Sequence, residues 1–359
     1  MNVLYLSSYN TKNKAGYYYA VTDRVVELRK QKINVYNVNF DRGCSAKKDV
    51  SDINLAFPKF LNSRFPFFYL SEAYLFICVL FFCKKRHFDV IHVHWAYPIG
   101  YIGCVVARYL NIPIVLSCHG SDIHTHPKKS RYIYRKTMFA LQYANKVLCV
   151  SYSLKEKLKE LFPEIKDNKI LVSYNGLKTK NPVAPINIDN RKLITYVGNL
   201  NYTKGADRLV KIVSLLTDKY KGKLRVNIIG DGPLKKELES EMAKLNVDVT
   251  FYGQLDREQV HSFIKFSNLI VMPSRREGFG LVALESFIYN TPCVAFDIPG
   301  LREVFKYNKL LLADSVKSYV KLCESILSGS NLELNSKKYK IDFRIDFVVN
   351  KELKVYEEI

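Results

Sequence analysis

Two carboxylates, Glu277 and Glu285, stand with seven residues between them, directly after the apolar run 268–273. The run predicts a buried strand, and residues 281–289 predict a helix. Glu277 is therefore expected in the connecting loop, and Glu285 about one turn into the helix.

The residues that follow the first glutamate suit a phosphate. Gly278 and Gly280 let the backbone approach a ligand, and the amides from Phe279 through Leu281 to Val282 begin the expected helix. Because carboxylates beside an anion site are unfavourable unless they contact hydroxyl groups, the pattern predicts a nucleotide sugar. One carboxylate would bind the sugar and the other the ribose, with the diphosphate between them. The alternative is a solvated helix start whose acids are stabilised by the positive helix end.

Length and composition indicate a globular protein of two ordinary domains, because the chain has 359 residues and is 48% apolar. The 55 Lys and Arg against 34 Asp and Glu give a net charge of +21. This charge calls for anionic partners, which could be nucleic acid, an anionic membrane or phosphorylated substrates. Eight cysteines without a C-x-x-C pair predict reduced core thiols in a cytoplasmic protein, and the first residues show no signal-peptide pattern.

Strands alternate with helices in both halves of the chain, which predicts an α/β protein of two parallel-sheet, Rossmann-like domains facing each other across a cleft. We expect a first domain at 1–178, a linker at 179–191 and a second domain at 192–342, with a final helix at about 343–359 packing back onto the first. The expected strands are 2–7, 33–40, 89–94, 113–118, 146–151 and 170–174, then 193–197, 224–229, 249–253, 268–273 and 292–296.

Histidines follow two expected strands of the first domain. His94 ends one of them, and His119 comes directly after the next, in a loop that reaches Asp122. Ligand-facing groups of doubly wound sheets lie at the carboxyl ends of strands, so these residues are candidates for the acceptor side of the site. The i, i+2 histidine pairs at 92–94 and 124–126 lack a nearby third ligand, and we therefore expect no metal.

The most apolar segment, 65–83, closes with the cations of 84–86. Its uninterrupted apolar part is too short to span a membrane. We expect a helix packed on the sheet, with part of its face in a membrane interface; the alternative is a fully buried core helix. Together with the cations and aromatic residues of 128–136, it would form a surface for an anionic membrane.

Several separate stretches resemble the glycosyltransferase family 4 members of the GT-B superfamily, in the family's order and over nearly the whole chain. The resemblance implies a retaining transfer of a sugar from a nucleotide donor, bound mainly by the second domain, to an acceptor held mainly by the first. The matching stretches are 119–122, 175–176, 197–200 with 204–205, 230–233, 252–255 and 277–285.

The resemblance also implies roles for single residues. Lys204 resembles the cation on the donor diphosphate, Glu285 the carboxylate on the ribose, and Glu277 the donor-sugar clamp together with the backbone that follows it. His119 resembles the first-domain histidine near the reacting sugar. Glu277, His119 and Lys204 are thus the catalytic candidates.

Further donor contacts follow from the same resemblance. Gly253, Gln254 and Leu255 would line the base, Gly230 would belong to the donor site, and Gly16 would approach the phosphates.

The family often has an arginine where Asn199 stands in this sequence. One positive charge on the diphosphate would be missing, and Arg208, Arg275 and Arg276 are candidates to replace it. A lysine and helix amides can stabilise the leaving diphosphate without a metal, and no Asp-x-Asp occurs in the chain, so we expect no cofactor.

The sequence thus predicts a retaining glycosyltransferase, with a UDP-sugar as the favoured donor and a glycan acceptor, possibly linked to polyprenyl diphosphate. It would act in bacterial surface polysaccharide synthesis, as a cytoplasmic or peripheral protein at the inner membrane face. The alternatives are a nucleotide-sugar epimerase of the same architecture and a basic nucleic-acid-binding protein, for which the chain has no recognised motif.

Overall fold

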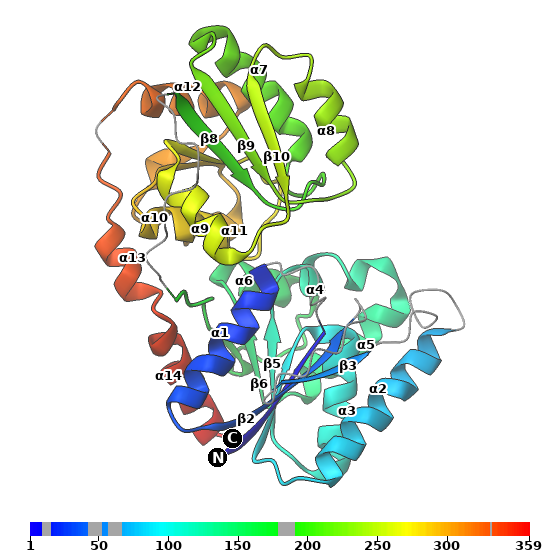
Figure 1. Cartoon of the computed structure of the whole chain (residues 1–359). Helices are drawn as coiled ribbons and strands as arrows, with labels where there is room; N and C mark the ends of the chain where they lie inside the picture. Colours follow the sequence, from blue (N-terminus) through cyan, green and yellow to red (C-terminus); the bar gives the residue numbers. More distant parts are fainter. Residues whose placement is uncertain (9–15, 42–51, 57–66, 179–190, 331) are drawn as a thin grey trace. The chain divides into compact units, whose positions relative to one another are not determined.

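The computed structural model describes residues 1–8, 16–41, 52–56, 67–178, 191–330 and 332–359 (Figure 1). The chain forms two compact units, residues 1–178 with 343–359 and residues 179–342. Apart from Arg191, the segment predicted as a linker lies outside the described residues.

The first unit is built on a seven-stranded parallel sheet of order β3-β2-β1-β4-β5-β6-β7. The central strands β4 and β5 are buried along their whole length, as expected for strands covered on both faces. Their register pairs His94 with Ser117, so His119 lies two residues beyond this pair. The strands are β1 (Asn2–Ser7), β2 (Asn34–Asp41), β3 (Asp52–Ala56), β4 (Val90–His94), β5 (Ile114–Cys118), β6 (Lys146–Cys149) and β7 (Ile170–Val172).

Two helices of this unit, those that begin at Arg131 and Tyr152, are capped by serine side chains. Ser130 accepts a hydrogen bond from the amide of Ile133, and Ser151 accepts one from that of Leu154. The main helices are α1 (Gly16–Lys30), α2 (Phe67–Lys84), α3 (Tyr101–Leu110), α4 (Ser121–His124), α5 (Arg131–Tyr143), α6 (Tyr152–Leu161) and the C-terminal α14 (Ile345–Glu357), with a π-helix at Ala96–Gly100 and 3-10 turns at Pro127–Lys129 and Asp167–Lys169.

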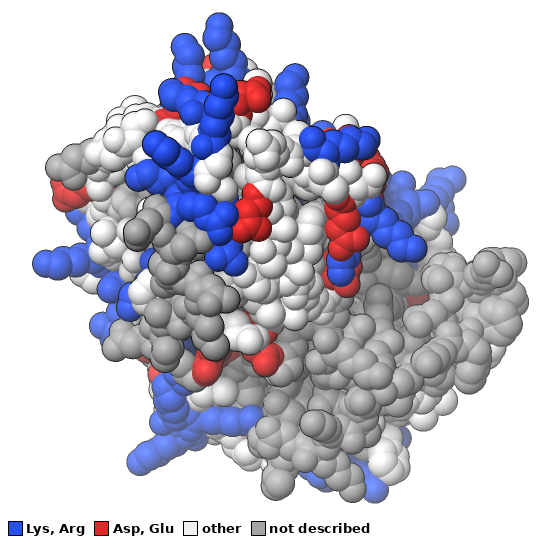
Figure 2. All heavy atoms as spheres, turned by 45° about the horizontal axis from the view of Figure 1, so that its top comes forward, with Lys and Arg blue, Asp and Glu red and all other residues white. Residues whose placement is uncertain are grey.

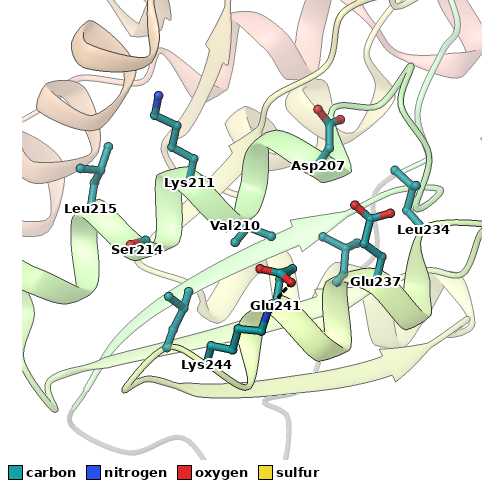
Figure 3. A pocket seen from close by; sticks show the side chains of 11 residues that line it. Asp207, Val210, Lys211, Ser214, Leu215, Leu234, Glu237, Glu241 and Lys244 are labelled. Atoms are coloured by element: carbon teal, nitrogen blue, oxygen red, sulfur yellow. Dashed lines mark hydrogen bonds and ion pairs between the residues drawn. The ribbon is translucent and has the colours of Figure 1, made fainter.

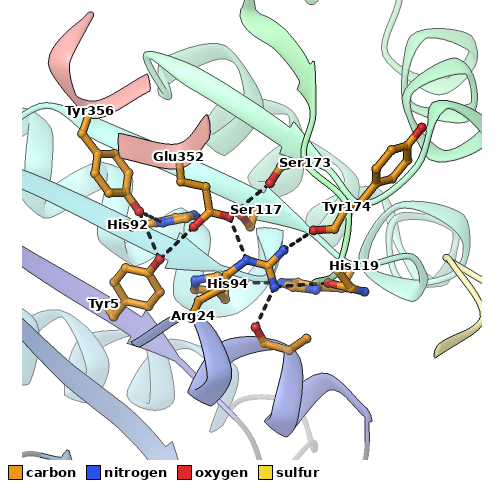
Figure 4. Close-up of polar contacts among 12 residues, drawn as sticks. Tyr5, Arg24, His92, His94, Ser117, His119, Ser173, Tyr174, Glu352 and Tyr356 are labelled. Atoms are coloured by element: carbon orange, nitrogen blue, oxygen red, sulfur yellow. Dashed lines mark hydrogen bonds and ion pairs between the residues drawn. The ribbon is translucent and has the colours of Figure 1, made fainter. Parts of the chain in front are cut away.

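A buried ion pair joins α14 to the rest of the first unit (Figure 4). The Glu352 carboxylate accepts hydrogen bonds from Arg24 Nε at 2.7 Å, Tyr5 Oη at 3.2 Å and Ser173 Oγ at 3.1 Å. The Arg24 and Glu352 side chains are only 2% and 1% exposed. Loss of one partner would leave a buried charge, at a cost of about 3–5 kcal/mol. This contact explains why the C-terminal helix packs within the first unit.

Helix α2 has a buried face and an exposed one, both apolar. Leu75 and Val79 are 1% exposed, whereas Leu70, Ile77 and Phe81 are 55%, 64% and 59% exposed. The alternative of a fully buried core helix is therefore wrong. No helix in the described part of the chain is long and apolar enough to cross a membrane.

A buried carboxylate interrupts the apolar sequence of α2. Glu72 accepts hydrogen bonds from Tyr97 Oη at 3.0 Å and Tyr132 Oη at 2.8 Å, and Lys136 Nζ lies 3.5 Å from its second oxygen. These contacts satisfy the carboxylate and hold α2 against α5.

The second unit has a six-stranded parallel sheet of order β10-β9-β8-β11-β12-β13. Its strands are β8 (Lys192–Val197), β9 (Leu224–Ile229), β10 (Asp248–Gly253), β11 (Leu269–Met272), β12 (Cys293–Phe296) and β13 (Leu312–Ala313). Its helices are α7 (Ala206–Tyr220), α8 (Lys235–Met242), α9 (Arg257–Phe266), α10 (Leu281–Ile288), α11 (Pro299–Arg302), α12 (Val316–Leu327) and α13 (Ser336–Asp342), with a 3-10 turn at Lys309–Leu311.

Seven of the eight cysteines lie in the described part of the chain, and all seven are free thiols. Six are buried and Cys78 is half-buried, which confirms the prediction of core thiols; Cys44 lies outside the described residues.

Candidate active site

The candidate catalytic groups of the second unit meet just beyond the end of β11. Lys204 Nζ lies 2.6 Å from Glu277 Oε2, and Ser274 Oγ donates to Glu277 Oε1 at 2.8 Å. The Glu277 side chain is 6% exposed and that of Lys204 is 34% exposed. Both carboxylate oxygens are thus held, so Glu277 is an oriented acceptor, and the cation beside it remains accessible. Ser274 was not anticipated, although its place three residues before Glu277 is a signal that could have indicated it.

Glycines allow the loops to meet at this point. A Cβ on Gly205, which has a φ of +69°, would lie 1.9 Å from the carbonyl oxygen of Pro273. A Cβ on Gly300 would lie 2.0 Å from that of Glu277. Gly280 has a φ of +89° and immediately precedes α10, as the sequence predicted. Larger residues at these positions would push the Glu277 loop away from Lys204.

The residues around the start of α10 differ in exposure. Gly278, Leu281 and Val282 are half-buried, whereas Phe279 is buried in the core. The backbone of this segment is thus partly accessible to a ligand, whereas the Phe279 side chain packs in the core.

The ends of the neighbouring strands form a second glycine-lined region. A Cβ on Gly230, at φ +132°, would lie 1.9 Å from the carbonyl oxygen of Gly198, and the Gly230 amide donates to Gly253 O at 2.7 Å. Asn199 is exposed, and its Oδ1 lies 2.5 Å from where a Cβ of Gly232 would stand. These contacts bring the ends of β8, β9 and β10 together.

The segment expected to line a base is open. Apart from its chain neighbours, no described residue has an atom within 4 Å of the position of a Cβ on Gly253, whose φ is +64°. Gln254 is exposed and Leu255 is half-buried.

The three candidate replacement cations are in different environments. Both terminal nitrogens of Arg275 lie 2.6 Å from the Asp207 carboxylate, and its guanidinium stacks 3.5 Å from the Tyr202 ring. Its charge is therefore neutralised, and the pKa of Asp207 is lowered by hydrogen bonding to it. Arg208 lies 4.5 Å over the ring of Phe296, and Arg276 is exposed. Arg208 and Arg276 are thus better placed than Arg275 to meet a phosphate.

The second glutamate, Glu285, is buried on α10, and its carboxylate meets residues of α9. Its Oε1 is 3.1 Å from His261 Nε2 and 3.8 Å from Arg257 Nε. The other ring nitrogen of His261 lies 2.9 Å from Tyr289 Oη. Sequence analysis missed His261 and Tyr289, because a lone histidine in a helix of ordinary composition gives no signal.

In the first unit, His94 and His119 form a hydrogen-bonded pair at the ends of β4 and β5 (Figure 4). His94 Nδ1 lies 3.1 Å from His119 Nε2. Burial is the main cause that lowers the pKa of both imidazoles well below the usual value, so both are neutral at pH 7. His94 Nε2 is buried and has no hydrogen-bond partner among the described residues.

Asp122 shapes the loop that carries His119. It is 1% exposed and accepts hydrogen bonds from the amides of His119 at 3.1 Å and Gly120 at 2.7 Å. Burial raises its pKa to about 6. The acceptor-side candidate Asp122 is therefore a buried residue that holds the loop through its backbone amides.

Two aromatic residues that the sequence analysis did not select lie near His119: Tyr17 contacts its ring, and Trp95 contacts Tyr17. The Tyr17 ring meets the His119 ring edge-on at 4.8 Å and that of Trp95 at 5.3 Å, and Tyr17 Oη donates to His94 O. Trp95 is the only tryptophan in the chain, which was an available signal. Gly16, at the start of α1, is exposed immediately before Tyr17.

A chain of hydrogen bonds fixes the protonation of His92, which lies two residues before His94 in β4 (Figure 4). Because the Glu352 carboxylate only accepts, Tyr5 donates to it, and Tyr356 then donates to Tyr5. His92 donates from Nδ1 to Tyr356 and accepts at Nε2 from Ser117 Oγ, 2.8 Å away. His92 is therefore a neutral, fully paired core residue.

A hollow of about 720 Å³ lies elsewhere, between α7 and α8 (Figure 3). Its lining residues include neither Lys204 nor Glu277. Within the described ranges, no group of three or more His, Cys, Asp or Glu residues could hold a metal ion. The hollow is lined by Asp207, Val210, Lys211, Ser214, Leu215, Leu234, Glu237, Leu238, Glu241, Lys244 and Leu245.

Comparison with known proteins identifies the family. Residues 178–342 match the family described as glycosyl transferases group 1, and residues 20–181 match the one described as glycosyltransferase family 4. An uncharacterized glycosyltransferase of Methanocaldococcus jannaschii is 32% identical over 288 residues, 77% of each chain. TuaC of Bacillus subtilis, provisionally named as a teichuronic acid biosynthesis glycosyltransferase, is 32% identical over 249 residues, 66% of this chain and 60% of TuaC.

A solved structure shows the same fold. Staphylococcus aureus TarM, in complex with fondaparinux, α-GlcNAc-glycerol and UDP, superposes with a TM-score of 0.77 at 12% identity, covering 99% of each chain. The chain belongs to the family 4 glycosyltransferases and has the GT-B type of fold, as the sequence predicted. It is a transferase, and its relatives include a protein named for polysaccharide synthesis.

Proposed function

We propose that this glycosyltransferase is a retaining enzyme that moves a sugar from a UDP-sugar to a glycan acceptor in bacterial surface polysaccharide synthesis. The observation that carries the proposal is the Lys204–Glu277 pair, held at 2.6 Å directly before the glycine turn that begins α10. A cation, an oriented carboxylate and a helix start together match the parts of a sugar diphosphate.

Each group of the second unit has a distinct part in this proposal. Lys204 and the first amides of α10 stabilise the negative charge that develops on the leaving diphosphate, and this stabilisation requires no metal. Glu277, held by Ser274, accepts from a hydroxyl of the donor sugar. Glu285 accepts from the ribose, and the open segment that begins at Gly253 receives the base.

The first unit supplies the acceptor side. His119 is neutral and half-buried, so it can exchange a hydrogen bond with a sugar hydroxyl without attracting the diphosphate, while the buried His94 holds its ring in place. Tyr17 packs against His119, and Trp95 packs against Tyr17; their aromatic surface suits the apolar faces of sugar rings.

We also propose that the first unit docks on the anionic inner face of the membrane, where the acceptor would be a polyprenyl-diphosphate-linked glycan. This unit has 30 Lys and Arg against 16 Asp and Glu, a net charge of +14, whereas the second unit has 25 against 18, a net charge of +7. Cations adjoin the exposed face of α2: Lys85 lies 4.1 Å from the Phe81 ring, and Lys84 lies 5.9 Å from that of exposed Tyr109. Each such cation contributes about 1 kcal/mol of attraction to anionic lipid.

Lys and Arg side chains are scattered over the face shown in Figure 2, mainly in its upper part, with fewer Asp and Glu among them. The basic excess is therefore not confined to α2. Attraction of a phosphorylated donor accounts for charge away from the membrane surface.

Calorimetric titration with UDP, ADP and GDP tests the donor assignment. We expect UDP to bind in the absence of a divalent cation, and chelator to leave its affinity unchanged. UDP-sugars would then be incubated with lipid-linked glycan and the anomeric configuration of the product determined. Retention supports the proposal, whereas inversion, or tight binding of ADP or GDP alone, would contradict it.

The epimerase alternative differs in one product. An epimerase converts a UDP-sugar to its isomer without an acceptor, whereas a transferase releases UDP only as the acceptor is consumed. Isomer formation without acceptor would favour the epimerase.

A further inference from the structure

A polar cluster between α9 and α10 surrounds Glu285 with residues that the function proposed above does not use. His261 is 4% exposed and projects from α9 between two residues of the α10 segment, Glu285 and Tyr289. Its two ring nitrogens lie 3.1 Å from Glu285 Oε1 and 2.9 Å from Tyr289 Oη. An imidazole paired on both sides has a fixed ring orientation.

The directions of these hydrogen bonds follow from their chemistry. A carboxylate only accepts, so His261 donates from Nε2 to Glu285. In the neutral imidazole Nδ1 is then an acceptor, and the hydroxyl of Tyr289 donates to it. Arg257 Nε is positioned to donate a longer hydrogen bond to His261 Nε2, at 3.4 Å, and lies 3.8 Å from Glu285 Oε1. A protonated Nε2 cannot accept that bond, and the shorter contact with the carboxylate favours the tautomer that donates from Nε2. The guanidinium therefore adds charge attraction without replacing the imidazole.

The second oxygen of Glu285, Oε2, has no hydrogen-bond or ion-pair partner among the residues that the structure describes. Among the described residues, the contacts of this carboxylate with His261 and Arg257 both go to Oε1. A hydrogen bond on one oxygen fixes the plane of the carboxyl group and thus the direction of Oε2. Helix α9 also begins directly after the base-lining segment 253–255, so a single helix adjoins both expected parts of the nucleoside.

We infer that His261 is a positioning residue, which through its hydrogen bond from Nε2 orients the Glu285 carboxylate for the ribose hydroxyls, with Tyr289 selecting the required tautomer. This inference rests on the proposed contact between Glu285 and the ribose. The competing explanation is that His261 only packs α9 against α10.

Discrimination between ribose and deoxyribose separates the two explanations. The affinities of UDP, 2′-deoxy-UDP and 3′-deoxy-UDP would be measured by calorimetry for the full chain, with ADP or GDP and their deoxy forms if one of these is the nucleotide that binds. His261→Asn removes the donor at the Nε2 position, whereas His261→Gln keeps an N–H there. Ser262→Ala, on the adjacent position of α9, is the matched control.

A positioning role predicts selective losses. We expect His261→Asn to lower the affinity for UDP about 10-fold, as for a lost hydrogen bond to a charged group. The affinity for whichever deoxy-UDP binds the parent more weakly should stay unchanged. His261→Gln and Ser262→Ala should remain within about 3-fold of the parent, and Tyr289→Phe should lose about 3-fold for UDP alone. Glu285→Ala should bring the ratio of the affinities for UDP and for this deoxy-UDP close to one.

Three results would overturn the inference. If His261→Asn weakens the binding of UDP and of the deoxy nucleotide equally, or weakens neither, the histidine has only a structural role. In that case, a reduced ratio of the two affinities in Glu285→Ala would still support the ribose contact. If Glu285→Ala retains the parent ratio, the ribose contact fails, although UDP binding itself would still support the donor assignment. Should His261→Asn fail to fold, Tyr289→Phe decides: a reduced ratio supports the inference and an unchanged ratio overturns it.

Discussion

The two units place opposite kinds of polar group at the ends of their sheets. In the second, a cation and a carboxylate pair at 2.6 Å with part of the lysine exposed, and Arg275 pairs with Asp207. In the first, the His94–His119 pair is held neutral by burial. Charge thus gathers where a diphosphate would bind, and neutral hydrogen-bonding groups gather where sugar hydroxyls would react.

The largest expected effect concerns the charged pair. Lys204→Ala and Glu277→Gln should each lower kcat/KM for transfer by about 10² to 10³, because each removes a group that acts on the reacting donor. Lys211→Ala, on the exposed face of α7, is the control and should keep the parent rate. Rates within a few-fold of the parent for both test variants would move the catalytic site elsewhere.

The neutral pair should have a smaller effect of a different kind. His119→Ala is expected to lower kcat for transfer by about 10- to 100-fold, as for the loss of one positioned hydrogen-bonding group. His87→Ala is the control, since its side chain is 83% exposed. An unchanged rate in His119→Ala would leave the histidine pair with a purely structural role.

One carboxylate in each unit, Asp122 in the first and Asp207 in the second, should contribute to the pH dependence of stability with opposite signs. Burial raises the pKa of Asp122 to about 6, so the stability linked to its protonated form is lost as pH rises through about 6. Relative to Asp122→Asn, the parent should lose about 2 kcal/mol between pH 4.5 and 6. The pKa of Asp207 is lowered, so its contribution is complete at neutral pH and is lost as pH falls toward and below 4.

Urea unfolding of the parent, Asp122→Asn and Asp207→Asn across this range measures both slopes. Differences from the parent that are independent of pH, or that share one sign, would contradict the assigned environments.

Exposed apolar residues in the two units allow a smaller test of membrane docking. Phe81→Ser on α2 should weaken sedimentation with anionic vesicles about 5- to 10-fold, since roughly 1–1.5 kcal/mol of burial is removed. Leu310→Ser is the matched control, because Leu310 is 85% exposed in the second unit. Equal losses in both variants, or binding that ignores lipid charge, would argue for a soluble acceptor.

Sequence patterns located the main strands because a parallel sheet needs apolar runs of fixed length between turn residues. They missed β3 and β13, which are short, and α12, whose buried Tyr319, Cys323 and Leu327 follow the helical period but carry no chemical motif. The family resemblance assigned Glu277 and Lys204 to one donor site, but their direct contact was not predicted. The contacts of Glu285 with His261 and of Arg275 with Asp207 depend on tertiary packing, so no local sequence pattern predicts them.

The most direct test of the central claim is calorimetric titration of UDP into the parent, Lys204→Ala and His119→Ala. If charge in the second unit binds the donor, Lys204→Ala should weaken UDP by about 10- to 100-fold, the loss expected for a hydrogen-bonded charge contact. His119→Ala should bind UDP as the parent does. The reverse outcome, with normal affinity in Lys204→Ala and lost affinity in His119→Ala, would contradict the division of roles between the two units.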